Sequence, residues 1–264
     1  MKTATNFIFL LVLSLVFCAC EQRWQPLFNG ENLDGWDRYI GTPIKGFETL
    51  HTQAKVDNVF SIEEIDGQKV IHISGSVNGA LATVDTFANY HLELVFKWGD
   101  KVYSRRNSGL LYHSFGEFGE AHGTWMTNIE CQLMHERMGD TYLMNNTCCE
   151  TTAQKTEEGF VYSPAAALTQ FGKNFNGAGI KKAMDAENPV GQWNTVELYS
   201  VGRTAVHVVN GKTVMVNTNT GYFEDGEIKP LRSGKIQIQS EGSELFIQSI
   251  RIKPISEIPG EILE

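Results

Sequence analysis

The sequence predicts an all-β fold in which antiparallel strands form a sandwich or jelly roll. Three observations predict this class. After the first 20 residues, no window of about a dozen residues carries apolar side chains at helical spacing. Short runs that alternate between apolar and polar residues recur along the chain, as expected for strands with one buried face. Asp-Gly and Asn-Gly pairs, which favour tight turns between antiparallel strands, separate some of these runs.

The alternation is clearest between Tyr90 and Trp98. Leu92, Leu94 and Phe96 fall on one face, and the residues between them fall on the other. Similar runs predict the remaining strands, which in chain order are 59–65, 70–74, 110–113, 129–134, 193–201, 204–209, 213–217, 235–240 and 245–252.

Two dipeptides connect neighbouring runs. Asp66-Gly67 lies between the runs 59–65 and 70–74, and Asn210-Gly211 lies between 204–209 and 213–217. Both central residues of a type I′ turn need positive φ, which Asn, Asp and Gly adopt most easily. We therefore expect two hairpins. About ten strands without crossover helices favour a sandwich over a βαβ fold.

Length and composition indicate one folded domain. The chain has 264 residues, of which 42% are hydrophobic and 20% charged, so it can bury a large core. β-sandwiches of this size often form one domain, and we expect a single domain over residues 21–264. The formal net charge of -9 argues against nucleic acid as a partner, because a phosphate backbone attracts basic surfaces.

The first 20 residues have the pattern of a secretory signal. Lys2 precedes an apolar run over 7–17 that is too short to span a bilayer. The run ends at Ala19-Cys20, which resembles the lipobox of bacterial lipoproteins. We expect an exported protein of the cell envelope whose only membrane contact is a lipid on Cys20. An ordinary signal peptide or an uncleaved anchor is the alternative.

The segment 151–190 stands apart from the alternating runs. It contains Gly172, Gly177 and Gly179 and shows little periodicity. Compact domains seldom keep long structureless loops unless they have a function. We expect a long loop or mobile flap over a binding cleft.

One predicted strand presents two polar side chains on a single face. Ile129, Cys131 and Leu133 form its apolar face, which must belong to the core, so Glu130 and Gln132 point the other way. Alternation alone leaves open whether this second face meets bulk water or a cleft.

Five short motifs resemble one bacterial family. The chain opens with L-F-N-G-x-x-L-D-G-W at 27–36, and the other motifs are Asn107-Ser108-Gly109, Glu130-Cys131-Gln132, 191–194 (G-Q-W-N) and 209–211 (V-N-G). Their order over roughly residues 27–255 resembles the 3-keto-α-glucoside 1,2-lyase / 3-keto-2-hydroxyglucal hydratase family, also called the 3-keto-disaccharide hydrolase family.

The resemblance implies a concanavalin A-like jelly roll that holds a sugar on one sheet. It also implies net hydrolysis of 3-keto-disaccharides. A ketone at carbon 3 acidifies the hydrogen at carbon 2, so a base begins the cleavage, elimination expels the aglycone from carbon 1, and hydration follows. Such a site needs a base, an acid, and a donor or cation for the enolate oxygen. We assign Glu130 as base and His113 as acid or enolate donor, and Asn107 and Gln132 as ligands of sugar hydroxyls.

Further candidates follow from position and residue type. His113 falls on the same face as Asn107, although a structural histidine is the alternative. Trp125 is a candidate sugar platform or a core aromatic. The remaining candidate substrate ligands are Arg105, Asp140 and His135, for which a solvated loop end, a turn residue and a buried side chain are the respective alternatives.

Two other classes of function remain open. A sandwich of this type also serves as a non-catalytic carbohydrate-binding module. A conventional glycosidase would pair Glu130 with a second carboxylate such as Glu93 or Glu197. No cofactor is required by the sequence, although a divalent cation held by His113, Glu130, Asp140 or His135 is an alternative stabiliser of the enolate.

Overall fold

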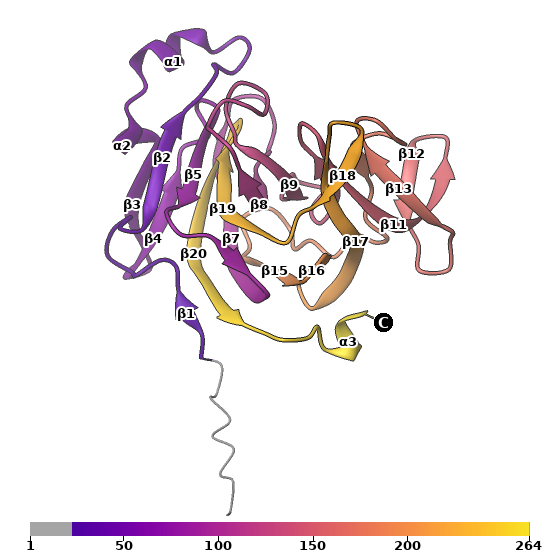
Figure 1. Ribbon diagram of the computed structural model, residues 1–264. Helices are drawn as coiled ribbons and strands as arrows, with labels where there is room; N and C mark the ends of the chain where they lie inside the picture. The colour runs from indigo at the N-terminus through magenta and orange to yellow at the C-terminus, as the bar shows by residue number, and fades with distance from the viewer. Residues whose placement is uncertain (1–22, 264) are drawn as a thin grey trace, which may run out of the picture.

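The structure is a computed structural model, and it describes residues 23–263. The predicted signal segment and the lipidation site at Cys20 lie outside the described residues. Two large antiparallel sheets face each other, so the predicted jelly-roll sandwich is confirmed (Figure 1).

The larger sheet has 12 strands. Its main path runs β12 (Gly159–Tyr162), β11 (Thr147–Thr156), β17 (Lys212–Glu224), β16 (Thr204–Val209), β15 (Asn194–Val201), β7 (Tyr90–Val102), β20 (Ser243–Pro254), β4 (Gln68–Ile73) and β3 (Phe60–Ile65). Three strands pair beside this path: β1 (Gln25–Pro26) on β20, β13 (Leu168–Gly172) on β11 and β18 (Glu227–Pro230) on β17.

The smaller sheet has eight strands. Its path runs β14 (Gly179–Ile180), β10 (Thr141–Leu143), β9 (Thr127–Gln132), β8 (Gly109–Phe115), β19 (Ser233–Ser240), β5 (Gly79–Thr83) and β2 (Trp36–Ile40), and β6 (Phe87–Ala88) pairs with β19. All ten strands that alternation predicts are present in the two sheets.

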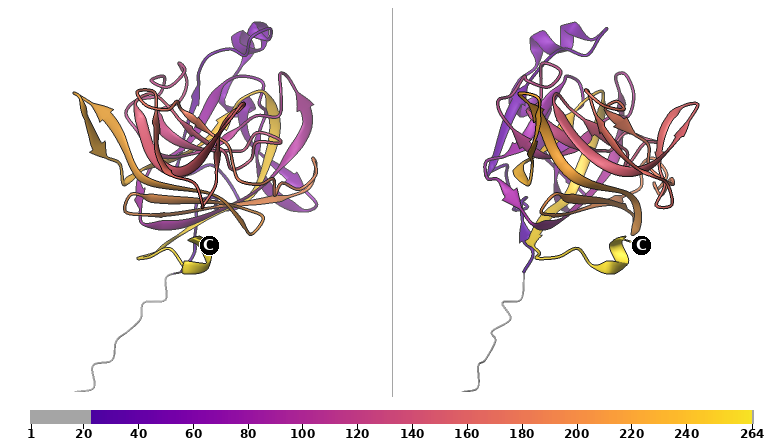
Figure 2. Two further views of the ribbon diagram at one scale, coloured as in Figure 1. Left: turned by 90° about the vertical axis from the view of Figure 1, so that its right-hand side faces the viewer. Right: turned by 45° about the vertical axis from the view of Figure 1, so that its right-hand side comes forward.

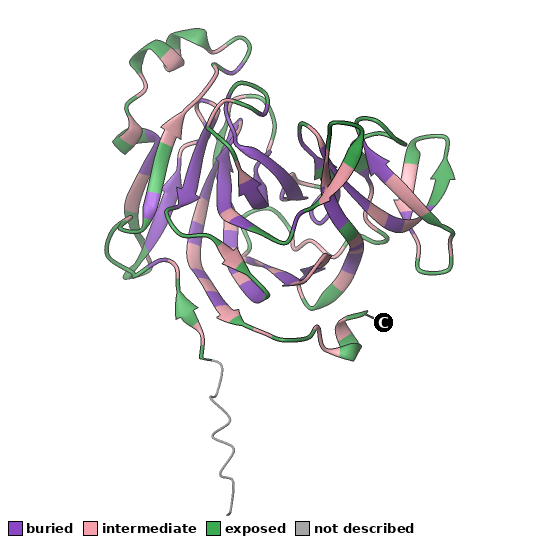
Figure 3. Cartoon of the chain, in the orientation of Figure 1, coloured by how far each residue is buried: buried purple, intermediate pink, exposed green. Residues whose placement is uncertain are grey.

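The core lies between the sheets because alternate residues of each strand point inward. Leu92 and Leu94 of β7 meet Ile129 and Cys131 of β9 and their neighbours in one large apolar cluster, and all four are fully buried. The central strands are the most buried part of the ribbon in Figure 3. Burial of this kind contributes roughly 25 cal/mol for each Å² of apolar surface removed from water.

Both predicted hairpins are confirmed. Asp66 and Gly67 have φ of 52° and 78°, and Asn210 and Gly211 have φ of 46° and 74°. These values give the positive φ that a type I′ turn needs at both central residues. The turns connect β3 to β4 and β16 to β17.

The segment 151–190 differs from the loop that the sequence predicted. It holds the end of β11 together with β12, β13 and β14, and β11 pairs with β17 of the larger sheet. Figure 1 shows β11, β12 and β13 on the side of the molecule away from α1 (Glu48–Gln53) and α2 (Val56–Val59). β11 is rich in threonine, which favours strands through its branched Cβ without adding apolar alternation, and β12, β13 and β14 are short. Movement of this segment as a flap stays a prediction.

The described termini lie at one end of the sandwich. β1 and the C-terminal helix α3 (Gly260–Leu263) are found at the same end in Figures 1 and 2. Ile255, Ile258 and Ile262 pack against Tyr199 and its neighbours on the larger sheet. Within residues 23–263, no helix has the length and apolar character needed to cross a membrane.

Candidate active site

A pocket of about 350 Å³ opens on the face of the smaller sheet that points away from the core. Strands β9, β10 and β19 supply part of its lining, and the rest comes from the segments before β5 and β8 and after β8, β10 and β19. Its lining consists of Asn78, Arg105, Asn107, His122, Trp125, Glu130, Gln132, Tyr142, Met144, Gln239 and Glu241. Five of the eight predicted catalytic and sugar-binding residues therefore meet here: Arg105, Asn107, Trp125, Glu130 and Gln132.

Strand β9 places Glu130 in the pocket as alternation predicts. Ile129 and Cys131 are buried between the sheets, while Glu130 and Gln132 line the pocket on the opposite face. Regular pairing holds this orientation, because Glu130 lies opposite Tyr142 of β10 and Leu111 of β8. A shift of one residue in either pairing would turn Glu130 into the core.

Gly109 makes room for the carboxyl group of Glu130. A Cβ atom at this position would lie 2.3 Å from Glu130 Oε1 and 2.6 Å from Gln239 Oε1. Real side-chain atoms do not approach so closely. The Asn-Ser-Gly motif therefore has a steric role, since only glycine allows the polar groups of β9 and β19 to meet above β8.

Several buried polar atoms at the floor have no partner in the described part of the protein. They are Asn107 Oδ1, Glu130 Oε1 and both side-chain polar atoms of Gln239. A buried polar atom without a hydrogen bond costs about 1–3 kcal/mol, so such atoms are rare unless a ligand or water satisfies them. Their convergence favours a ligand with many hydroxyl groups.

The carboxyl group of Glu130 is in an environment that favours its neutral form. Only 2% of the residue is exposed. Burial raises the pKa of Glu130 well above its usual range, and the nearby negative charges of Glu241 and Asp140 raise it further. Burial therefore favours the protonated form of Glu130, which can donate a hydrogen bond.

Glu241 is a second carboxyl group in the same pocket, and the sequence analysis did not identify it. It lies in the turn between β19 and β20, where no periodicity assigns a face. Desolvation raises the pKa of Glu241 to about 7, and the guanidinium of Arg105 and the amide of Asn107 limit the rise. Glu241 is thus partly ionised at neutral pH, whereas the surroundings of Glu130 favour its protonated form more strongly. The only signal in the sequence that could have identified Glu241 as a site residue was its position before Gly242, at the end of a predicted strand.

Trp125 forms a wall of the pocket. Its Nε1 donates a hydrogen bond of 2.9 Å to Gly79 O, and its ring packs in a small apolar cluster with Ala80, Leu111 and Met144. Only 3% of Trp125 is exposed. The two alternatives for this residue, a core aromatic and a pocket surface, are therefore both realised in part.

His113 does not share the pocket, which corrects the predicted pairing with Glu130. The pairing of β8 shifts register between Tyr112 and Phe115, and His113 has φ of 52° within this irregularity. The imidazole therefore turns inward, where its Nε2 lies 3.3 Å from Ser200 Oγ of the larger sheet. Burial lowers the pKa of His113 to about 4. It is a neutral core residue, and its assignment as acid or enolate donor was wrong.

His135 and Asp140 also lie outside the pocket. His135 Nδ1 pairs with Glu187 Oε1 at 2.8 Å. Asp140 accepts hydrogen bonds from Arg137 Nε at 2.7 Å and from the backbone N–H of Lys182 at 2.8 Å. Both residues follow the end of β9, where the strand alternation that placed Glu130 no longer applies. They connect the β9–β10 loop to the segment 181–187, and neither lines the pocket.

The four residues named as cation ligands are consequently separated. His113, His135 and Asp140 each contact a different neighbour, and none of them lines the Glu130 pocket. Among residues 23–263, no three His, Cys, Asp or Glu side chains converge in an arrangement that would hold a metal ion.

The carboxylates first considered as partners of Glu130 belong to the other sheet. Glu93 and Glu197 lie opposite each other on β7 and β15. Glu93 forms an ion pair with Arg251, and Glu197 pairs with His91 at 2.7 Å. Neither Glu93 nor Glu197 can therefore form a catalytic pair with Glu130. Glu241 is the carboxyl group that shares the pocket of Glu130.

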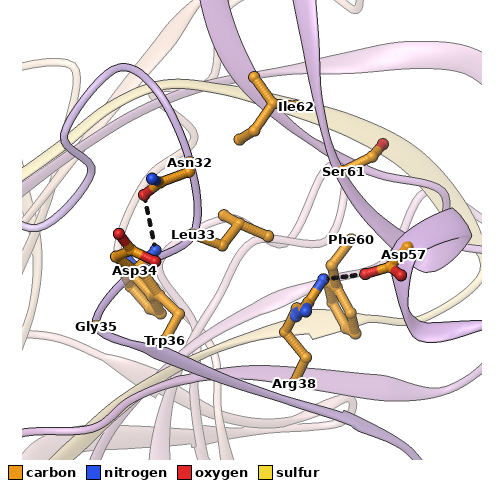
Figure 4. Close-up of a pocket in the computed structure, with 10 residues that line it drawn as sticks. All are labelled: Asn32, Leu33, Asp34, Gly35, Trp36, Arg38, Asp57, Phe60, Ser61 and Ile62. Carbon is orange, nitrogen blue, oxygen red and sulfur yellow. Dashed lines mark hydrogen bonds and ion pairs between the residues drawn. The ribbon is translucent and has the colours of Figure 1, made fainter.

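A wider cavity of about 560 Å³ lies near the edge strands β2 and β3 (Figure 4). Two of its three charged side chains, Arg38 and Asp57, form an ion pair with each other, and the third is Asp34. Within the described residues, none of the buried unpartnered polar atoms belongs to this lining. We therefore place the candidate site at Glu130 and not in this cavity.

The L-F-N-G-x-x-L-D-G-W motif borders this second cavity and has a structural role. Trp36 Nε1 donates a hydrogen bond of 2.7 Å to Leu27 O, and Asn32 Oδ1 accepts one of 3.0 Å from the N–H of Asp34 (Figure 4). Gly30 and Gly35 have positive φ, which the turns of the motif require.

A family model for the 3-keto-alpha-glucoside-1,2-lyase-like domain matches residues 23–253. The chain belongs to this family. The match spans both sheets and the Glu130 pocket, and it agrees with the resemblance that the five motifs indicated. A comparison with curated proteins finds no match.

Several solved structures are similar to this chain. Two crystal structures from Parabacteroides distasonis, each described as a "putative glycosyl hydrolase", are 18% and 20% identical with TM-scores of 0.50 and 0.49. Both cover 88% of this chain, and the matches cover 100% and 94% of those chains. A carbohydrate-binding module of family 66 from Bacillus subtilis is 10% identical with a TM-score of 0.44, over 83% of this chain and 95% of that one.

Glu130→Gln is expected to make the protein more stable at neutral pH. The folded state holds a proton on Glu130 that the unfolded state releases above its pKa of about 4.5. The free energy of unfolding therefore falls by about 1.4 kcal/mol for each pH unit between the unfolded and folded pKa values. The glutamine side chain of the variant does not titrate, so its stability lacks this loss at higher pH. In urea unfolding, the free energy of unfolding of the variant should exceed that of the wild type clearly at pH 7 and hardly at all at pH 4.

The control for this measurement is Glu158→Gln, which removes an exposed carboxylate paired with Lys181. This variant should show no gain in stability between pH 4 and pH 7. An equal effect of Glu130→Gln at both pH values would contradict the neutral state of Glu130.

Proposed function

We propose that the Glu130 pocket cleaves 3-keto-glucosides by elimination at carbons 1 and 2, followed by hydration. Membership of the family supports an activity on glycosides. The observation that carries the proposal is the pair of carboxyl groups in one pocket, of which Glu130 is neutral and Glu241 has a pKa of about 7. A base and a hydrogen-bond donor with different pKa values are what an enolate-forming site needs.

The pKa values assign the roles of base and hydrogen-bond donor differently from the sequence analysis, which made Glu130 the base. Glu241, as the carboxylate, removes the proton from carbon 2 of the 3-keto sugar. Glu130, as the neutral acid, donates a hydrogen bond to the carbonyl oxygen at carbon 3 while this oxygen becomes an enolate. A donor placed in this way contributes about 2.7–4 kcal/mol to catalysis.

The remaining bonds change without further catalytic groups. The enolate re-forms the ketone and expels the aglycone oxygen from carbon 1, and the aglycone takes its proton from water. The hydroxide that remains from this water adds to carbon 1 of the resulting enone, and Glu241 returns its proton to carbon 2, which regenerates a 3-keto sugar and the carboxylate. Arg105 stabilises the carboxylate of Glu241, and the free side-chain amide of Gln239 and the free Oδ1 of Asn107 suit the sugar hydroxyls.

Kinetics on a 3-keto-glucoside test these roles. Glu241→Gln should lower kcat/KM by a factor of about 10² to 10⁴, the usual contribution of a general base. The wild-type rate should rise with pH through about 7 as Glu241 ionises, and it should fall at higher pH as Glu130 loses its proton. Glu130→Gln, which keeps a donor, should retain more activity than Glu130→Leu.

The control variant is Glu197→Gln on the other sheet, which should keep wild-type activity. Wild-type activity in Glu241→Gln would exclude Glu241 as the base. If Glu130→Gln is as inactive as Glu130→Leu, the result would indicate that Glu130 is the base.

A conventional glycosidase is the second candidate, because Glu130 and Glu241 also form an acid and base pair of the kind that such enzymes use. The two functions differ in their dependence on the ketone. Equal cleavage of an unmodified glucoside and its 3-keto form would favour the glycosidase, and release of an enone would favour elimination. Sugar binding without any product would favour a binding module.

Export with a lipid anchor on Cys20 is a further part of the proposal, and it rests on the sequence pattern alone. Metabolic labelling with a fatty acid analogue should mark the wild-type protein. The label should be lost in Cys20→Ser, and retention of the label would contradict lipidation at this residue.

A further inference from the structure

A group of aromatic and basic side chains surrounds Trp24 at the start of the described chain. The guanidinium carbon of Arg251 lies 4.4 Å from the centre of the Trp24 ring, and the ammonium of Lys253 lies 4.9 Å from it. The ring of His91 lies 4.7 Å from the same ring. Trp24 itself is only partly buried. These four residues are called the Trp24 cluster below.

We infer that the Trp24 cluster is a docking surface for the phospholipid membrane that holds the lipid of Cys20. The inference rests on the lipid anchor proposed above, and it does not depend on the reaction at Glu130. It adds how the folded domain is oriented on the membrane.

Strand pairing fixes the cluster on the outer face of the larger sheet. Gln25 of β1 lies opposite Ile252 of β20. The side chain of Ile252 belongs to the core, so its neighbours Arg251 and Lys253 point to the outer face. Trp24 contacts both of these basic side chains and therefore lies on the same face.

The connection between the cluster and the lipidated residue is short. Three residues separate Cys20 from Trp24 in the sequence. An extended chain spans at most about 3.3–3.6 Å for each residue, so the backbone of Trp24 stays within about 14 Å of the backbone of Cys20. A lipid on Cys20 therefore keeps the Trp24 cluster close to the headgroups of the membrane.

The side chains of the cluster suit this position. Tryptophan is enriched at the level of the headgroups because its ring has an apolar body and a polar N–H group, and lysine and arginine attract anionic lipids. Lys253 forms no ion pair with any of residues 23–263. Arg23, directly before Trp24, is exposed. Both positive charges are thus available to lipid phosphate groups.

The acidic residues on the same face of β7 and β15 are compensated within the sheet. Glu93 accepts hydrogen bonds from Arg251 at 2.7 and 3.0 Å, and Glu197 pairs with His91 at 2.7 Å. The charge of Lys253 is therefore not cancelled by these carboxylates. A basic region on a chain with a net charge of -9 favours one orientation at an anionic membrane.

This orientation leaves the Glu130 pocket open to solution. Glu130 lies on the outer face of the smaller sheet, whereas the Trp24 cluster lies on the outer face of the larger sheet. The core of the sandwich therefore separates the pocket from the docking surface. A substrate can reach Glu130 from the aqueous side without crossing the headgroups.

The tryptophans of the chain allow a direct test, because two of the five are not buried, Trp24 and Trp193. Trp193 is the matched control. It also has a basic side chain over its ring, with the ammonium of Lys97 at 4.7 Å from the centre. However, Lys97 lies farther along β7 than His91 by about 20 Å, the length of six extended residues. The other three tryptophans are buried: Trp36, Trp98 and Trp125.

The experiment measures tryptophan fluorescence of the lipidated full chain in vesicles of phosphatidylcholine and phosphatidylglycerol, with and without bromine on the acyl chains near the headgroups. Bromine should quench the wild type and Trp193→Phe, and the quenching should be lost in Trp24→Phe. Lys253→Gln should lower the equilibrium constant for docking about fivefold, the usual contribution of one basic residue near anionic lipids. Lys97→Gln should leave the quenching unchanged.

Flotation of the same vesicles separates the anchor from the docking surface. A protein that does not float with the vesicles lacks the anchor, and the docking surface fails with it. A protein that floats but shows no quenching of Trp24, or equal quenching of Trp24 and Trp193, would overturn the docking surface alone. Quenching that Lys253→Gln leaves unchanged would also overturn it. The activity at Glu130 enters none of these outcomes.

Discussion

The candidate site depends on the burial of one carboxyl group. Glu130 lies on the central part of the smaller sheet, 2% exposed, and its Oε1 has no partner among the described residues. Most of the other features of the pocket follow from this arrangement. Gly109 leaves space for the carboxyl group, and the charge of Glu241 helps to keep it neutral. Burial of such a group reduces stability, and proteins accept this cost mainly at functional sites.

The differing pKa values of the two carboxyl groups are what give the pocket its chemistry. Glu130 is surrounded by strands on both sides, whereas Glu241 lies at a turn beside Arg105. Two identical side chains therefore have different pKa values in one cavity. In the proposed mechanism, a pocket with only one of these groups would lack either the base or the donor.

The sequence predicted the fold and part of the pocket lining. It did so because apolar and polar residues alternate wherever the strands are regular. Ile129 and Cys131 fixed the facing of Glu130, and the structure confirms it. Alternation failed for His113 because the irregular pairing of β8 reverses the direction of its side chain. It offered nothing for Glu241, a turn residue. It missed β11 because this threonine-rich strand lacks an apolar period, and it missed β12 to β14 because they are too short to show one.

The measurement that tests the central claim most directly is a titration of the glutamate side-chain carbons by ¹³C NMR, with Glu130→Gln and Glu241→Gln used to assign the two signals. We predict that Glu130 is protonated at pH 7 and that Glu241 titrates near pH 7. Removal of the Glu241 charge should also lower the pKa of Glu130, since the two groups interact. A Glu130 signal that titrates near pH 4.5 and is unaffected by Glu241→Gln would contradict the account.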